Sequence, residues 1–226
     1  MTSQPTLHPA LFEFLNAIQE HNSRKYFASI RPLYDDIMHN RQDFIKTLGK
    51  EFTNSDPSFA ELDIKKCLFR IYRDARRLKT WDPIYKNNFW ALIHPEWKKT
   101  TKAAPYIHLQ PGNSMFAWGI YRADNTELNK IRTYLTEHGS QYYKIIENKE
   151  FKQRSWRVTG NPLTNLPRWR DNETPYPELI KKKQFLIYHS YTDAEVLSDS
   201  FFSDIVQDYL IAKSFFDMLN SPLQES

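Results

Sequence analysis

The chain has 226 residues, of which 40% are hydrophobic, 15% aromatic and 26% charged, and its formal net charge is +4. This composition excludes an intrinsically disordered chain, which lacks the apolar side chains needed to build a core, and no apolar run approaches the roughly 20 residues that cross a bilayer. Five glycines in the whole chain argue against a glycine-rich phosphate loop, and a single cysteine excludes an internal disulfide.

The first quarter of the chain is predicted to be helical. Apolar residues recur at helical spacing over residues 8–20. Ser23 is placed to cap a longer helix over residues 24–52, because its hydroxyl can accept a free amide of the first turn. Pro32 has no amide hydrogen, so it predicts a kink or a restart within that helix. The polar segment TNSDPS at residues 53–58 predicts the turn that ends it.

Five later segments are predicted to be strands, because they are rich in β-forming residues or alternate apolar and polar side chains. They are residues 68–72, 89–93, 106–110, 114–121 and 184–191. The third and fourth flank Pro111-Gly112-Asn113, a short turn typical of a β-hairpin. No helix is predicted among the first four strands, which indicates an antiparallel sheet.

Helices are predicted again after the hairpin. Asp124 and Glu127 have the spacing of a capping box, and Gly139 is a natural stop for the helix that they begin. A short helix over 140–148, an irregular loop over 156–177 and a terminal helix from Asp199 complete the pattern.

This order predicts an α+β fold, with a mostly antiparallel sheet of about four to five strands and helices packed on one face. The N-terminal part is expected to be helical, and a helix is expected at the C-terminal end. We expect one domain over residues 1–226, with flexible ends at 1–7 and 221–226.

The charge is unevenly distributed. Residues 65–102 hold 11 Lys and Arg against three acidic residues, and residues 149–183 hold nine against four. Basic blocks of this kind indicate a positive face that attracts anions. In the alternative interpretation, these charges pair across the fold on ordinary solvated faces.

The candidate binding residues gather between positions 70 and 86. Arg70 and Tyr72 share one face of a predicted strand, and a guanidinium at a strand end matches carboxylate or phosphate oxygens. We therefore predict a basic pocket for an anionic small molecule, in which Arg70, Arg73 and Lys86 hold the anion, Tyr72 or Tyr85 donates a hydrogen bond, and Asp74 is the candidate catalytic acid or base. The alternative pairs Asp74 internally with an arginine and uses the Tyr72 hydroxyl to close the core.

Four segments also carry a family resemblance: HNSRKYF (21–27), RIYRDARR (70–77), IYKNN (84–88) and YIHLQPGNSMFAWGIY (106–121). Over about residues 11–219 the chain resembles the domain of unknown function 2461 family. The residues that match its motifs are Asn22, Arg24, Phe27, Arg70, Tyr72, Arg73, Asp74, Tyr85 and Lys86, so the resemblance adds Asn22 and Arg24 to the candidate ligands. It implies a shared fold unit and a cytosolic setting, and no reaction.

A second function class is a module that binds nucleic acid or a protein partner. Cations and aromatic rings alternate in one loop, as in sites for single-stranded nucleic acid: Arg154, Trp156, Arg157, Arg168, Trp169 and Arg170. No helix-turn-helix, zinc-finger or RNA-recognition signature accompanies them. The same tryptophans are alternatively anchors of the loop.

Neither a metal nor a cofactor is expected. The seven histidines lack HxxxH or HExxH spacing, and Cys67 has no thiolate partner for zinc. A lone cysteine fits a reducing compartment, and the N-terminus lacks the basic and apolar regions of a secretory signal. A cytoplasmic location without membrane contact is therefore expected.

Overall fold

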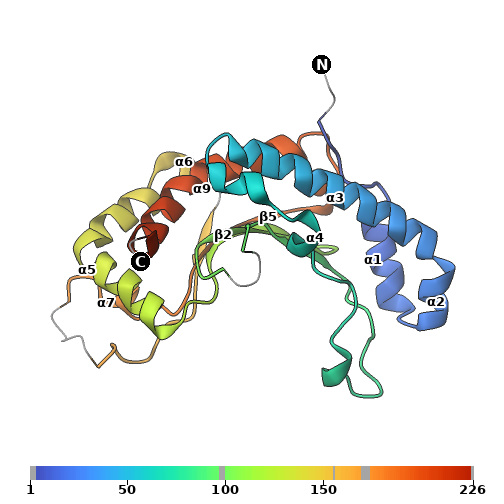
Figure 1. Ribbon diagram of the computed structural model, residues 1–226, viewed down its shortest axis with the longest axis horizontal. Coiled ribbons are helices and arrows are strands. Elements are labelled where there is room, and N and C mark those ends of the chain that lie inside the picture. The colour runs from blue at the N-terminus through green and yellow to red at the C-terminus, as the bar shows by residue number, and fades with distance from the viewer. Residues whose placement is uncertain (1–3, 97–99, 155, 169–173, 225–226) are drawn as a thin grey trace. The chain divides into compact units, whose positions relative to one another are not determined.

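The computed structural model describes residues 4–96, 100–154, 156–168 and 174–224 (Figure 1). Its helices are α1 (Leu11–Glu20), α2 (Arg24–Ser29), α3 (Arg31–Thr53), α4 (Ile64–Cys67), α5 (Asn125–Ile146), α6 (Lys149–Gln153), α7 (Pro177–Ile180), α8 (Asp193–Val196) and α9 (Phe201–Gln224), with 3-10 turns η1 (Pro57–Glu61) and η2 (Ala75–Arg77). The strands are β1 (Phe89–Leu92), β2 (Ala104–Leu109), β3 (Ser114–Ile120), β4 (Arg157–Thr159) and β5 (Phe185–Tyr191). They form one antiparallel sheet in the order β1-β2-β3-β5-β4, so the fold is α+β as predicted.

The chain divides into two compact units. The first consists of Met1–Lys98, Tyr106–Phe116 and Ser190–Val206, and the second of Lys99–Pro105, Ala117–His189 and Gln207–Ser226. Strands β2, β3 and β5 and helix α9 contribute residues to both units. The expectation of a single domain stays a prediction. None of the helices in the described ranges has the length and apolar composition of a membrane span.

The N-terminal helices of the first unit begin where the sequence predicts. The Ser23 hydroxyl accepts the Tyr26 amide at 3.2 Å and caps α2. Pro32 stands in the first turn of α3, so it marks a restart rather than a kink. Asn40 donates to the Thr6 carbonyl, and Leu7 is buried, so ordered structure begins inside the end predicted to be flexible. At the other end, the predicted flexible residues up to 224 belong to α9.

Helices α1 and α3 pack against β1 in the first unit. Phe14 of α1 stacks on Phe89 of β1 with ring centroids 5.9 Å apart, and Arg41 of α3 lies over the same ring. Alternation along β1 and β2 buries Phe89, Ala91, Ile107 and Leu109. Their neighbours Trp90, Tyr106 and His108 are half-buried on the other face.

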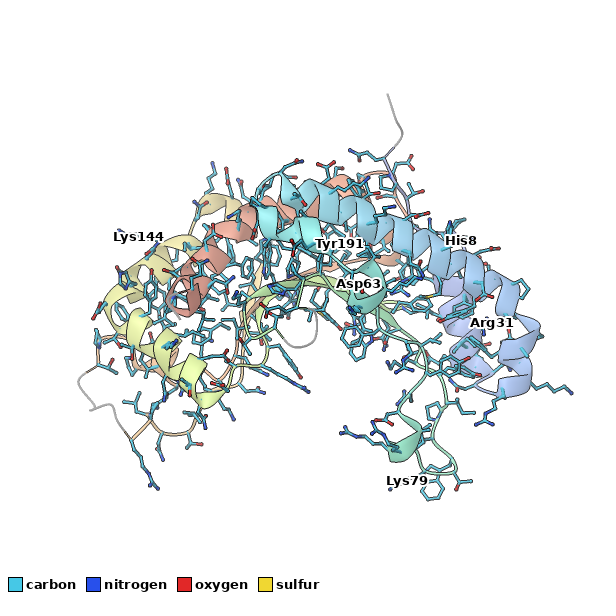
Figure 2. All side chains as sticks on the ribbon, viewed as in Figure 1. His8, Arg31, Asp63, Lys79, Lys144 and Tyr191 are labelled. Atoms are coloured by element: carbon cyan, nitrogen blue, oxygen red, sulfur yellow. The ribbon has the colours of Figure 1, made fainter. Side chains whose placement is uncertain are left out.

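The predicted strand at 68–72 is absent. Two isolated bridges join this segment to later residues. Leu68 pairs with Ala91 of β1, and Tyr72 pairs with Tyr85, which precedes β1. Between the bridges the backbone makes an excursion, and we call residues 70–86 the basic arm. Figure 1 shows it extending away from the helices of the first unit, and Figure 2 labels Lys79 at its tip. The β-forming residues 68–72 therefore lie where the basic arm begins and do not form a strand of the sheet.

Helix α5 of the second unit runs through Gly139, which the sequence analysis treats as its end. Its first turn carries the predicted capping box between Asp124 and Glu127. A Cβ at Gly139 would lie only 2.3 Å from the ring of Tyr176. The glycine therefore makes room for a packed side chain, and the predicted separate helix over 140–148 is the continuation of α5.

Four elements in the described part of the C-terminal half were not predicted: helices α6, α7 and α8 and strand β4. Strand β4 pairs antiparallel with β5, although all three of its residues are exposed. Helix α8 begins with a capping box between Thr192 and Glu195, and α9 starts at Phe201 rather than at Asp199. In the second unit, Trp118 of β3 stacks on Tyr209 and Phe216 of α9, at 4.5 and 3.6 Å.

Candidate functional site

The root of the basic arm is held by Asn22, which lies just before α2. The Asn22 side-chain amide donates to the carbonyl oxygens of Tyr85 and Ile18, each at 3.0 Å, and its oxygen accepts the Tyr85 amide at 2.9 Å. This pairing satisfies both backbone groups of one residue, as a neighbouring strand would. Asn22, expected as a ligand, therefore positions the arm.

We expect Asn22→Ala to lower the free energy of unfolding by about 2–4 kcal/mol, because it leaves the Tyr85 amide and carbonyl without partners in a half-buried place. Urea unfolding measures the loss, and trypsin cleavage within the arm should become faster. Asn87→Ala is the matched control, since Asn87 makes one exposed bond to Gln19. Equal losses in the two variants would contradict the role assigned to Asn22.

Aromatic rings pack around the same root. Phe27 of α2 stacks on Tyr85 with centroids 4.3 Å apart, and Tyr72 lies 5.0 Å from Tyr85. Tyr85 is buried, whereas Tyr72 is 43% exposed. Burial raises the pKa of Tyr85, and the nearby Arg24 and Arg31 act in the opposite direction. The Tyr85 hydroxyl therefore stays protonated near neutral pH.

Asp74 is engaged within the arm. Its carboxylate accepts the Arg76 guanidinium at 2.7 and 2.9 Å and the Arg76 amide at 3.2 Å, and it caps η2. The hydrogen bonds from Arg76 lower the pKa of Asp74 to about 2. A carboxyl group with this pKa is ionised near pH 7 and does not serve as a general acid. The structure thus matches the alternative in which Asp74 pairs internally.

The three expected anion ligands differ in their surroundings. The Lys86 ammonium donates to the Arg70 carbonyl oxygen at 2.8 Å and lies 4.8 Å from the centroid of the Trp90 ring. The side chains of Arg70 and Arg73 are exposed, and every residue from 72 to 77 is exposed. This run of exposed residues belongs to a projecting arm, and the basic pocket stays a prediction.

The tip of the arm carries a residue that the sequence analysis passed over. Trp81 is 79% exposed, and the Lys79 ammonium lies 5.7 Å from its ring centroid. Asp82 accepts the Lys79 amide at 2.9 Å and closes the turn. A tryptophan inside a polar, basic segment with no apolar periodicity was the available signal.

The loop proposed for nucleic acid has a different structure. Trp156 is 7% exposed and stacks near Phe151, and Arg154 pairs with Asp208 at 2.7 Å. Trp156 is therefore a core anchor, the alternative named for it above. Arg157 and Arg168 are exposed, whereas Trp169 and Arg170 lie outside the described residues.

No three His, Cys, Asp or Glu side chains of the described ranges gather as metal ligands would.

The chain was compared with protein families, with curated proteins and with solved structures. Residues 10–218 match the family model described as a conserved hypothetical protein, DUF2461. No curated protein and no solved structure matches the chain. Since this family model covers nearly the full length of the chain and includes the whole basic arm, the protein belongs to the DUF2461 family.

Proposed function

We propose that this protein binds an extended anionic polymer, single-stranded nucleic acid, along its basic arm. The observation that carries the proposal is the exposure of Trp81 among cations at the tip. A large aromatic side chain in this position leaves an apolar plane in water, and a stacked base would cover it.

The charge of the arm fits this ligand. Residues 70–86 hold six Lys and Arg against two acidic residues, and one arginine, Arg76, is neutralised by Asp74. The remaining exposed cations are spread along the arm: Arg70, Arg73, Arg77 and Lys79. Cations spaced along a projecting segment can follow a phosphate backbone, whereas a small anion is better held by a concave site.

The test is fluorescence anisotropy with labelled twelve-nucleotide oligo(dT) and oligo(U) at several salt concentrations. If about four cations each neutralise a phosphate, log K should fall against log salt with a slope of about −3. Trp81→Ala should weaken binding about 5- to 150-fold, because one stacked base contributes about 1–3 kcal/mol. Lys46→Ala, an exposed lysine of α3 outside the arm, should leave the affinity unchanged.

Absence of binding to both oligonucleotides at low salt would reject the proposal. Equal affinities for the wild type and Trp81→Ala would reject stacking at the tip and leave only charge attraction.

A small anionic molecule at the root of the arm is the second candidate. It is supported by the exposed Tyr72 next to Tyr85, near the guanidinium groups of Arg24 and Arg31. Phosphate, nucleotides or dicarboxylates should then raise the melting temperature of the wild type and not of Arg73→Ala. A ligand effect retained in Arg73→Ala would contradict this second candidate. A cytoplasmic location belongs to the same proposal, and a chain with a single cysteine, the buried Cys67, fits a reducing compartment.

A further inference from the structure

An open cavity of about 510 Å³ lies in the second unit, at the N-cap of α5. Its lining comes from the segments next to four strands, namely before β2, after β3, after β4 and before β5, and every lining residue belongs to the second unit. The volume falls in the range of about 300–1,000 Å³ that sites for small molecules occupy. The cavity is therefore large enough to hold a metabolite.

Hydrogen bonds hold the walls of this cavity in place. The Lys183 amide donates to the Asn161 carbonyl at 2.9 Å and thereby joins the segment after β4 to the segment before β5. The side-chain amide of Gln184 donates to the Tyr121 carbonyl at 3.3 Å, so the end of β3 is joined to the same place. Walls that are fixed before a ligand arrives lower the entropic cost of binding it.

Two cations line the cavity, Arg122 and Lys183, and both residues are exposed. Within the part of the chain that the structure describes, neither the guanidinium nor the ammonium forms an ion pair or donates a hydrogen bond. The acidic residue of the lining, Asp124, is held by the capping box, in which its Oδ1 accepts the Glu127 amide at 2.9 Å. Two cations without carboxylate partners beside one cavity favour a doubly charged group, such as a phosphate monoester.

An aromatic ring lies beside these cations. Tyr121 is 62% exposed and lines the cavity, and the guanidinium carbon of Arg122 lies 5.9 Å from its ring centroid. A planar base stacked on this ring would cover its exposed face. The Asp124 Oδ2 makes no hydrogen bond to any described residue, and a carboxylate oxygen accepts from ribose hydroxyls. Base, sugar and phosphate thus each have a matching group at this cavity.

We propose that this cavity binds a nucleoside monophosphate, with its phosphate held by Arg122 and Lys183 and its base stacked on Tyr121. The proposal does not depend on the nucleic-acid proposal, because the basic arm lies wholly in the first unit and the cavity wholly in the second. The cavity encloses room for one nucleotide, whereas the arm spreads its cations along an extended segment.

Isothermal titration calorimetry with AMP tests the proposal, since a purine offers a large plane for stacking. In the wild type, adenosine and ribose 5-phosphate should each bind at least about tenfold more weakly than AMP, because each lacks one part of the ligand. Tyr121→Ala should weaken AMP binding about 5- to 150-fold and leave ribose 5-phosphate binding unchanged. Arg122→Gln should weaken the binding of both phosphates about 10- to 150-fold, because a charge-assisted hydrogen bond is lost.

Tyr188→Ala is the matched control. Tyr188 of β5 also has an arginine beside its ring, with the guanidinium carbon of Arg157 at 5.9 Å, but it does not line the cavity. Its loss should leave the AMP affinity unchanged.

Absence of AMP binding to the wild type would overturn the proposal. Equal AMP affinities of the wild type and Tyr121→Ala would overturn it as well, because the nucleotide would then bind elsewhere, for example at the root of the arm. Arg122→Gln replaces an exposed side chain without a hydrogen-bond partner among the described residues, so it decides the location even if Tyr121→Ala fails to fold.

Discussion

Gly119→Ala is expected to lower the free energy of unfolding by about 3–5 kcal/mol, from the sum of backbone strain and overpacking. Gly119 of β3 has a φ of +141°, which side chains with a Cβ rarely adopt. A Cβ there would lie 1.9 Å from the Phe185 carbonyl oxygen and 2.9 Å from the Leu186 Cα. Because both neighbours are backbone atoms of β5, no side-chain rotation relieves the clash. Urea unfolding followed by circular dichroism measures the effect.

Gly112→Ala separates strain from crowding. Gly112 lies in the hairpin turn with a φ of +67°, and nothing stands within 4 Å of the position of its Cβ. Only the left-handed backbone conformation is then unfavourable, by about 1–2 kcal/mol. If the two alanine variants were equally stable, the close approach of β3 and β5 would not be what requires a glycine at position 119.

The second large effect is expected at Asp208 of α9. Its side chain is fully buried, and its two oxygens lie 2.7 Å from Arg154 Nε and 2.7 Å from His189 Nδ1. A carboxylate only accepts, so the His189 Nδ1–H donates to it. Asp208→Ala should lower the free energy of unfolding by about 3–5 kcal/mol, because it removes a fully buried carboxylate that binds both the Arg154 guanidinium and the His189 ring. Thermal and urea unfolding both report the loss.

The control for Asp208 is an exposed pair on the same helix. Lys213 and Asp217 approach to 2.6 Å, and Asp217 is 61% exposed. Asp217→Ala should change stability by no more than about 1 kcal/mol, since water and salt screen such pairs. Similar losses at Asp208 and Asp217 would show that burial adds nothing to the Asp208 ion pair.

Part of the fold and part of the candidate site were predictable, because the interactions that build them are local. The Ser23 cap and the Asp124–Glu127 box join residues three apart, and their patterns are visible in the sequence. The pairing of Asp74 with Arg76 spans two residues, and the sequence analysis named an internal pair as one alternative. The family motif drew attention to Asn22, Tyr72 and Tyr85, which the structure does bring together.

The roles of these residues were not predictable, because they depend on partners far along the chain. Asn22 and Tyr85 are 63 residues apart, and nothing local distinguishes an amide that holds a backbone from one that binds a ligand. Trp81 and Trp156 have similar basic flanks in the sequence. Only packing against Phe151 separates the buried tryptophan from the exposed one. The sequence analysis therefore predicted a pocket for the anion, whereas in the structure these residues belong to a projecting arm.

The amino-acid sequence by itself determined the α+β class, the hairpin of β2 and β3, the helix starts at Ser23 and Asp124 and the family, since each depends on periodicity or on contacts within a few residues. The tertiary structure alone decided that α5 continues through Gly139, that the exposed β4 pairs with β5, and that residues 68–72 begin an arm. It alone also placed the buried Arg41 beside the Met38 sulfur, the Trp90 carbonyl and the Phe89 ring. These outcomes depend on which distant backbone or side chain occupies the neighbouring space, and a local pattern carries no information about that neighbour.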